Sequence, residues 1–273
     1  MLEEIVEIKG KQKGPTSIII AGIHGNEDCG PKAFQKILPK LKIEKGRIFF
    51  IYGNPLALRN KKRFIDYDLN RLFKNARTLS KQEKTSYEYQ RALLIKKCLR
   101  KATALLDIHA SQTRGSQPFI ICEPKSYKLA TYLPANIIIS GFDKFEPGGT
   151  DYFMNRLGKK GICLECGYAG AMGATKIAEA GIMAFLKALN HLPNKTASTN
   201  KQLYKISSLY RTKTKKFQLT REFRDFEIIE AGQTIGLDGS EKIIAHQKCS
   251  ILFARNRKMI GAEAFILIKT ASR

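Results

Sequence analysis

The chain has 273 residues, of which 43% are hydrophobic and 26% charged, and its formal net charge is +24. This composition is typical of soluble globular proteins and excludes collagen, coiled coil and whole-chain disorder. Its apolar runs, such as residues 17–23, are far shorter than the ~18–20 residues of a membrane helix, and the acidic, alternating start differs from a secretory signal, so we expect a cytoplasmic protein without a membrane span.

Strand-like runs alternate with helical patterns through the first 190 residues. Strands are expected at residues 5–8, 17–23, 47–52, 104–108, 118–122, 137–140 and 161–165, and helices at 31–38, 81–100, 151–157 after a Thr150 cap, and 175–189. Most of the strands are continuous apolar runs, as in sheets that are covered on both faces. The alternation predicts an α/β core with a largely parallel sheet and helices on both faces.

The pattern changes after His191. Residues 192–200 are polar and turn-rich, and short β-like runs with Gly-containing turns follow at 227–230, 234–237, 242–245, 250–255 and 264–269. We therefore predict two domains, an α/β domain over residues 1–192 and a small all-β domain over residues 200–273.

The basic excess is spread along the chain, because residues 201–273 alone contain 15 basic and 7 acidic residues. The basic runs are not interleaved with the aromatic residues of a single-strand stacking platform, and Trp is absent. A basic surface that steers anionic substrates is therefore favoured over a specific nucleic-acid partner.

The six cysteines are scattered and lie mostly in apolar stretches. Cys163 and Cys166 form a single CxxC within a predicted strand, where the two positions point to opposite faces. Neither a four-thiolate zinc site nor a redox motif is expected, and the cysteines are interpreted as small buried residues.

Two histidines lie at predicted strand ends. His24 and Glu27, three residues apart, follow the strand at 17–23, and His109 follows the strand at 104–108. Open α/β sheets place their ligand crevices at this edge. Two imidazoles and one carboxylate would make a zinc site with a position open for water, as in catalytic sites. The alternative is that His24 and His109 are separate loop histidines with no common site. Their shared position at strand ends favours the metal site over this alternative.

Five motifs occur in an order that resembles the succinylglutamate desuccinylase/aspartoacylase family of zinc-dependent amidohydrolases. They are HGNE at 24–27, NP at 54–55, RFIDYDLNR at 63–71, DIH at 107–109 and the Glu and Gly at 165 and 167. Residues 221–265 also resemble the family's C-terminal β domain. The resemblance implies a zinc carboxypeptidase-like fold: a mixed, mainly parallel sheet with helices on both faces, and a small C-terminal all-β domain that narrows the substrate entrance.

The resemblance also implies a role for each matching residue. One zinc ion per chain would be held by His24, Glu27 and His109, Glu165 would be the general base, Arg63 would stabilise the oxyanion, and Asn70 with Arg71 would hold a substrate carboxylate. Alternatively, Arg63 belongs to a solvated basic run, and residues 68–71 form a polar turn that caps the next helix. Asp68 is a candidate for orienting a neighbouring arginine.

The resulting interpretation is a zinc-dependent amidohydrolase that cleaves an N-acyl amino acid, or a similar small carboxylated amide, with metal-activated water. Residues 255–261 contain no Tyr where aspartoacylase carries one that reads the aspartate side chain, so N-acetylaspartate is not the expected substrate. Two alternatives stay open: a metallocarboxypeptidase acting on short peptides, and a basic nucleic-acid or anionic-surface binding module on a hydrolase scaffold. The sequence is compatible with a homo-oligomer and does not decide it.

Overall fold

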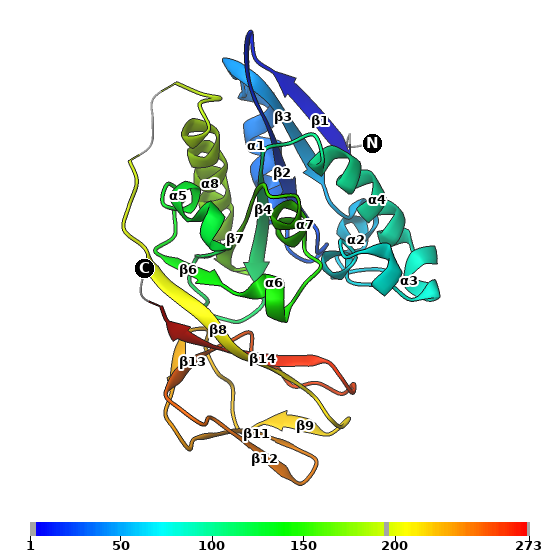
Figure 1. Ribbon diagram of the computed structural model, residues 1–273, viewed down its shortest axis with the longest axis vertical. Helices are drawn as coiled ribbons and strands as arrows, with labels where there is room; N and C mark the ends of the chain where they lie inside the picture. Colours follow the sequence, from blue (N-terminus) through cyan, green and yellow to red (C-terminus); the bar gives the residue numbers. More distant parts are fainter. Residues whose placement is uncertain (1–3, 194–196, 272–273) are drawn as a thin grey trace.

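The computed structural model describes residues 4–193 and 197–271, and shows an α/β part followed by a β-rich C-terminal part (Figure 1). The strands of the α/β part are β1 (Ile5–Lys9), β2 (Gln12–Ala21), β3 (Lys45–Tyr52), β4 (Ala104–Ser111), β5 (Phe119–Ile121), β6 (Ile137–Ser140) and β7 (Lys160–Tyr168). Its α-helices are α1 (Cys29–Ile37), α2 (Pro55–Asn60), α3 (Lys81–Thr85), α4 (Tyr87–Leu99), α5 (Tyr127–Ala130), α6 (Phe142–Phe145), α7 (Thr150–Arg156) and α8 (Ala174–Ala188). The predicted alternation of strands and helices is confirmed.

The centre of the sheet is parallel. Strands β3, β2, β4 and β7 are parallel neighbours, whereas β1 and β5 run antiparallel to β3 and β7. All eight residues of β4 are buried, as expected for a strand between two helical layers. The register sets His109 of β4 beside Glu165 of β7 at the carboxyl edge. The sheet is therefore mixed and mainly parallel, as predicted.

Helices cover both faces of this sheet. Alternate residues of β2 enter different cores, because successive side chains of a strand point to opposite faces. Ile19 packs in the core that contains Phe34 of α1 and Phe185 of α8, whereas Ile20 packs with Ile95 of α4. Among the described residues, no helix is both long and apolar enough to cross a membrane.

Two helix predictions need correction. The expected helix at 81–100 is divided at Ser86, whose extended backbone ends α3 and whose hydroxyl accepts the amide hydrogen of Tyr89, 3.2 Å away, to cap α4. Thr150 does not cap α7. It is the first helical residue, after Gly149, and its hydroxyl donates to the Asp107 carboxylate instead.

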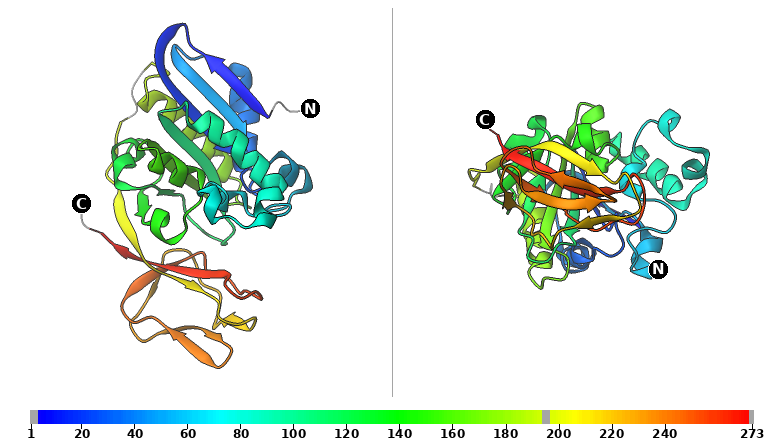
Figure 2. Two further views of the ribbon diagram at one scale, coloured as in Figure 1. Left: turned by 45° about the vertical axis from the view of Figure 1, so that its right-hand side comes forward. Right: turned by 90° about the horizontal axis from the view of Figure 1, so that it is seen from below.

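The C-terminal part continues the central sheet. Its strands are β8 (Gln202–Arg211), β9 (Phe217–Leu219), β10 (Glu227–Ile229), β11 (Thr234–Asp238), β12 (Glu241–Ile244), β13 (Cys249–Leu252) and β14 (Glu263–Thr270). Strand β8 pairs in parallel with β6, so that β8, β14, β13 and β10 complete an eleven-stranded sheet, while β12, β11 and β9 form a second sheet (Figure 2).

The sequence prediction did not include β8 or β9. Most side chains of β8 are exposed or half-buried, so this strand lacks the apolar run that identified the others. Part of the turn-rich segment, residues 194–196, lies outside the described residues. The division into domains at 192 and 200 stays a prediction.

Candidate active site

His24, Glu27 and His109 form a compact buried group at the carboxyl edge of β2 and β4. One Glu27 oxygen lies 2.8 Å from His24 Nδ1, and the other lies 3.0 Å from His109 Nδ1. All three side chains are at most 5% exposed. The loop that carries His24 packs tightly at Gly25, where a Cβ atom would lie 2.1 Å from the Ala57 carbonyl carbon. The sequence thus folds so that three separate donors meet.

The donor set fits a divalent cation. One atom from each of the three residues lies within 4.8 Å of the others, and two imidazole nitrogens with one carboxylate oxygen are the three protein ligands of many catalytic zinc sites. Burial would raise the pKa of Glu27, but the charges and hydrogen bonds of His24 and His109 hold it well below its usual range. Glu27 therefore offers a charged oxygen.

A carboxylate contacts the Nε2 atom of each imidazole, on the side away from Glu27. The Asp68 Oδ1 atom lies 3.1 Å from His24 Nε2, and Asp107 Oδ2 lies 3.2 Å from His109 Nε2. The buried hydroxyl of Thr150 donates to Asp107. Carboxylates in this position fix the ring orientation of metal-ligating histidines and leave the inner nitrogen available. The sequence reasoning assigned no such role to Asp107.

Arg63 lies beside the triad formed by His24, Glu27 and His109. Its guanidinium donates to Asp68 Oδ2 over 3.1 and 3.3 Å, and it approaches Glu27 at 3.4 Å. These contacts between Asp68 and Arg63 agree with the expectation that Asp68 orients a neighbouring arginine. Burial would raise the pKa of Asp68, but His24 and Arg63 hold it well below its usual range. The Arg63 side chain is 37% exposed and lines the cavity.

A buried glutamate holds the loop that presents Arg63, Asn70 and Arg71. Glu88 of α4 is fully buried, and its carboxylate accepts the side-chain amide of Asn54 at 3.1 Å. It also accepts three consecutive backbone amides, those of residues 65–67, at 2.8 to 3.3 Å. Glu88 therefore joins the NP motif at 54–55 to the motif at 63–71.

Glu165 lies at the carboxyl end of β7, next to His109 in the sheet. It is 7% exposed, and its Oε2 atom has no hydrogen-bond partner among the described residues. Burial raises the pKa of Glu165 to about 8, with Glu27 and Asp225 adding to the rise and His109 and Arg63 opposing it. A buried carboxyl whose pKa is shifted toward neutrality, with a free oxygen in the cavity, is suited to proton transfer.

Asn70 and Arg71 also reach the cavity, in the short 3₁₀ turn Leu69–Arg71. Asp68 caps this turn by accepting the Asn70 amide at 2.9 Å, so residues 68–71 do form a polar turn. They do not cap the next α-helix, which begins at Lys81 after a Ser80 cap. The guanidinium of Arg71 is not free: it donates to Glu263 at 2.9–3.1 Å and to Glu146.

The pKa values of the two acids around Arg71 shift in opposite directions. Burial raises the pKa of Glu146, which also contacts Arg211. The pKa of Glu263 is lowered: burial opposes this, but the hydrogen bond with Glu146 and the charge of Arg71 outweigh it. Two arginines and two glutamates therefore form one ionic cluster at this end of the cavity.

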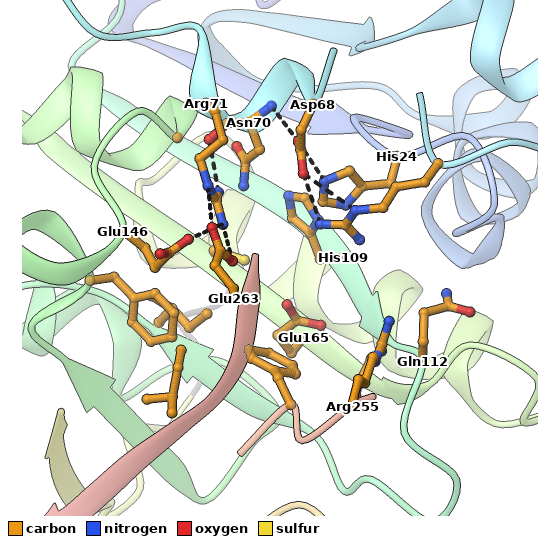
Figure 3. Close-up of a pocket in the computed structure, with 18 of the residues that line it drawn as sticks. His24, Asp68, Asn70, Arg71, His109, Gln112, Glu146, Glu165, Arg255 and Glu263 are labelled. Carbon is orange, nitrogen blue, oxygen red and sulfur yellow. Dashed lines mark hydrogen bonds and ion pairs between the residues drawn. The ribbon is translucent and has the colours of Figure 1, made fainter. Parts of the chain in front are cut away.

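All seven predicted site residues line one cavity of about 660 Å³. Figure 3 shows Glu165 with His24 and His109 above it. Arg71, Glu146 and Glu263 lie to one side, and Arg255 with Gln112 to the other. Gln112, Glu146, Arg255 and Glu263 were not predicted, because they come from loops and from the C-terminal part. The size and lining suit a small polar molecule.

Cys163 and Cys166 are buried, as the sequence interpretation expects, and His191 is buried as well. His191 is buried and contacts the Ser17 hydroxyl and the Lys45 carbonyl, both at 2.8 Å. Cys163 and Cys166 are buried in different cores on opposite faces of β7, as their spacing predicts.

Comparison with known proteins agrees with this geometry. A sequence profile of the succinylglutamate desuccinylase/aspartoacylase catalytic domain matches residues 13–189. A succinylglutamate desuccinylase of Ectopseudomonas mendocina is 24% identical over 97% of this chain and 86% of its own length, and a probable aspartoacylase of Trichodesmium erythraeum is 30% identical over 55% and 54%.

Solved structures extend the likeness to the whole fold. A succinylglutamate desuccinylase structure from Vibrio parahaemolyticus superposes with a TM-score of 0.81 at 18% identity, covering 98% of this chain and 86% of that one. An aspartoacylase family protein from Mesorhizobium loti gives 0.69 at 24% identity, covering 98% and 89%. The profile match spans well over half of the sequence, and the chain belongs to the succinylglutamate desuccinylase/aspartoacylase family.

Proposed function

We propose that this protein is a zinc-dependent deacylase that hydrolyses the amide bond of an N-acyl amino acid. The observation that carries the proposal is the His24, Glu27 and His109 donor set with the buried Glu165 carboxyl beside His109, whose Oε2 atom has no hydrogen-bond partner among the described residues. Family membership supports the same chemistry, since the relatives are named as desuccinylases and aspartoacylases.

His24, Glu27 and His109 would hold the zinc ion. When bound, such an ion polarises the scissile carbonyl and makes a water molecule more acidic. Glu165 accepts the proton of the attacking water as the oxygen adds to the carbonyl carbon. It then returns that proton to the amide nitrogen as the C–N bond breaks, which releases a carboxylic acid and an amino acid.

Two further groups complete the proposed site. The fixed charge of Arg63 stabilises the negative charge that develops on the carbonyl oxygen. Asn70 and Arg71 bind the carboxylate of the amino-acid portion. Because the donors of Arg71 are already engaged with Glu146 and Glu263, the substrate carboxylate joins the ionic cluster and shares these donors.

The test combines metal content with hydrolysis of a panel of N-acyl amino acids. Wild-type protein is expected to contain about one zinc per chain and to release free amino acid. Glu165→Gln is expected to keep the metal and to lose at least about 100-fold in kcat, since general acid–base catalysis contributes roughly 10²–10⁴-fold. His109→Ala is expected to lose both metal and activity.

Reconstitution with zinc, cobalt or nickel identifies the metal that supports turnover. Full activity of Glu165→Gln would remove the assigned base, and wild type that binds no zinc after reconstitution would overturn the proposal. Preferential release of the C-terminal amino acid from short peptides would support the metallocarboxypeptidase alternative instead.

A further inference from the structure

A second cavity, of about 850 Å³, lies at α5 and the neighbouring strands β6 and β8 (Figure 1). Its walls come from residues 123–131 around α5, from the two strands, and from residues 198–201 before β8. Among the residues that the structure describes, none lines both this cavity and the active-site cavity. The proposed deacylase chemistry therefore does not use it.

The floor of the second cavity is a pair of parallel strands. Ile138 of β6 lies beside Leu203 of β8, and the next pair on this face is Ser140 with Lys205. All four residues line the cavity. Lys201 lies two positions before Leu203, and alternation along a strand places residues 201, 203 and 205 on one face. The floor thus has an apolar centre that is flanked by two lysines.

Lys201 carries a buried positive charge without an acidic partner. The residue is 8% exposed, and its Nζ atom donates to the Leu133 carbonyl at 2.8 Å and to the Thr199 hydroxyl at 2.6 Å. Both acceptors are neutral, and Lys201 forms no ion pair within residues 4–193 and 197–271. Burial lowers the pKa of Lys201. An ammonium group has three donors, so one donor and the charge lack a partner.

Lys96 provides a comparison, because it is a buried lysine whose surroundings are complete. Its Nζ atom also donates to two neutral acceptors, both backbone carbonyls, at 2.9 and 3.0 Å. The rings of Phe73 and Phe153 lie 5.7 Å from the same atom and stabilise its charge by cation–π interaction. Lys201 lines a cavity instead.

The other charges of the second cavity are mainly positive. Lys128 and Lys205 also line it, and neither makes an ion pair with another described residue. Glu123 is the only acid among its described lining residues. The Glu123 carboxylate already accepts the backbone amides of Gly141 and Asp143, at 2.9 and 3.3 Å. The lining therefore attracts an anion and offers it unpaired donors.

We propose that this cavity binds a small organic anion, with the acidic group at Lys201 and the apolar body over Ile138 and Leu203. The anion supplies the charged acceptor that the Lys201 ammonium lacks, and the floor buries hydrocarbon. Carboxylates and phosphate esters share this chemistry, and the choice of probes separates them. The proposal does not depend on the deacylase function.

Calorimetric titration of the whole chain with four probes tests the proposal. Benzoate and phenyl phosphate each combine a ring with an acidic group, whereas benzyl alcohol lacks the charge and inorganic phosphate lacks the ring. At least one of the two aromatic anions is expected to bind more tightly than benzyl alcohol and inorganic phosphate. The tighter of the two identifies the acidic group that the cavity prefers.

Two variants locate the bound anion. Lys201→Met is expected to weaken binding of the tighter aromatic anion by about 10–100-fold, because a charged hydrogen bond is lost. Lys205→Glu changes an exposed position, so the fold is kept, and binding is expected to weaken by about 3–10-fold. Lys242→Glu is the charge-matched control, since Lys242 is exposed on β12 and lies outside both cavities. It should bind the anion as wild type does.

Arg63→Met separates the two cavities, because Arg63 lines the active-site cavity alone. Binding that is lost in Arg63→Met and kept in Lys205→Glu would place the anion in the active-site cavity and overturn the proposal. Binding that neither lysine variant weakens would overturn it too. The same conclusion would follow if benzyl alcohol bound as tightly as the aromatic anions, or if neither anion bound at millimolar concentration.

Discussion

Single carboxylates set the orientation of both histidines in the candidate metal site. Asp68 contacts the outer nitrogen of His24, and Asp107 that of His109. Each acid is positioned in turn, Asp68 by Arg63 and Asp107 by Thr150. Such supporting contacts typically contribute 10–100-fold to metal affinity, so the donor geometry depends on residues that never contact the ion.

Thr150 gives the most specific test of this arrangement. Thr150→Val removes the hydroxyl that donates to Asp107 while keeping the side-chain shape, so zinc affinity is expected to fall by about 10-fold. Competition with a chromophoric chelator measures it. Thr78→Val is the control, since the Thr78 hydroxyl contacts the Asn75 carbonyl on the surface. Unchanged zinc affinity in Thr150→Val would show that Asp107 needs no such support.

The two supporting acids differ in how far the sequence predicts them. Asp107 precedes His109 by two residues in a strand, so both side chains lie on one face, and this spacing could have identified it. The contact between His24 and Asp68 spans 44 residues of chain. Only folding brings that pair together, and the family motif rather than the spacing pointed to this segment.

In the C-terminal strands, one carboxylate links β11 to the turn that follows β8. Asp238 is 3% exposed and accepts hydrogen bonds from the Tyr210 hydroxyl and from the amides of Lys213 and Thr214, at 2.6–3.0 Å. Burial would raise the pKa of Asp238, but a hydrogen bond from the Thr214 hydroxyl, together with these donors, lowers it below its ordinary value. The charged carboxylate therefore stabilises the folded state.

Asp238→Asn is expected to lower the free energy of unfolding by about 1–3 kcal/mol at pH 7. Because the folded-state pKa is depressed, this stabilisation is fully present above the unfolded value of about 3.9 and is lost as the pH falls through the folded value. Urea denaturation at several pH values should therefore show wild type and variant converging in acid.

Glu241→Gln is the control in the same hairpin. Its partner is Lys213 Nζ at 2.8 Å, in an exposed ion pair, and such pairs contribute about 0–1 kcal/mol. A difference between wild type and Asp238→Asn that stays constant down to pH 2 would show that the Asp238 charge is not what stabilises the turn.

At the scale of secondary-structure elements, apolar runs in the sequence predict the strands whose side chains are buried. They do not predict a strand that forms mainly by pairing with its neighbours. The second half of strand β2 and the whole of β4 are continuous buried runs, and their positions follow from the apolar runs in the sequence. Most side chains of strand β8 are exposed or half-buried, and this strand forms because β6 and β14 pair with it on either side. Arg255 lies in an irregular segment after β13, where no period indicates which side chain enters the cavity.

The whole molecule is joined by a shared sheet and a shared core. Strand β8 pairs with β6, so backbone hydrogen bonds connect the α/β part to the C-terminal strands. One buried cluster takes side chains from both parts: Phe119 and Ile139 from β5 and β6, and Ile206, Leu252 and Ile266 from β8, β13 and β14. Neither part keeps this core when the other unfolds.

Unfolding is therefore expected as a single calorimetric transition at fixed metal load, with calorimetric and van't Hoff enthalpies in agreement. Leu252→Ala removes buried volume from the shared cluster and should destabilise by about 2–5 kcal/mol. It should lower the melting temperature of the entire transition, whereas Ile228→Ala, at a 58% exposed position, should not. Two resolved transitions, of which Leu252→Ala shifts only one, would instead support independent domains divided near residues 192–200, because the shared core would then contribute too little to couple the two parts.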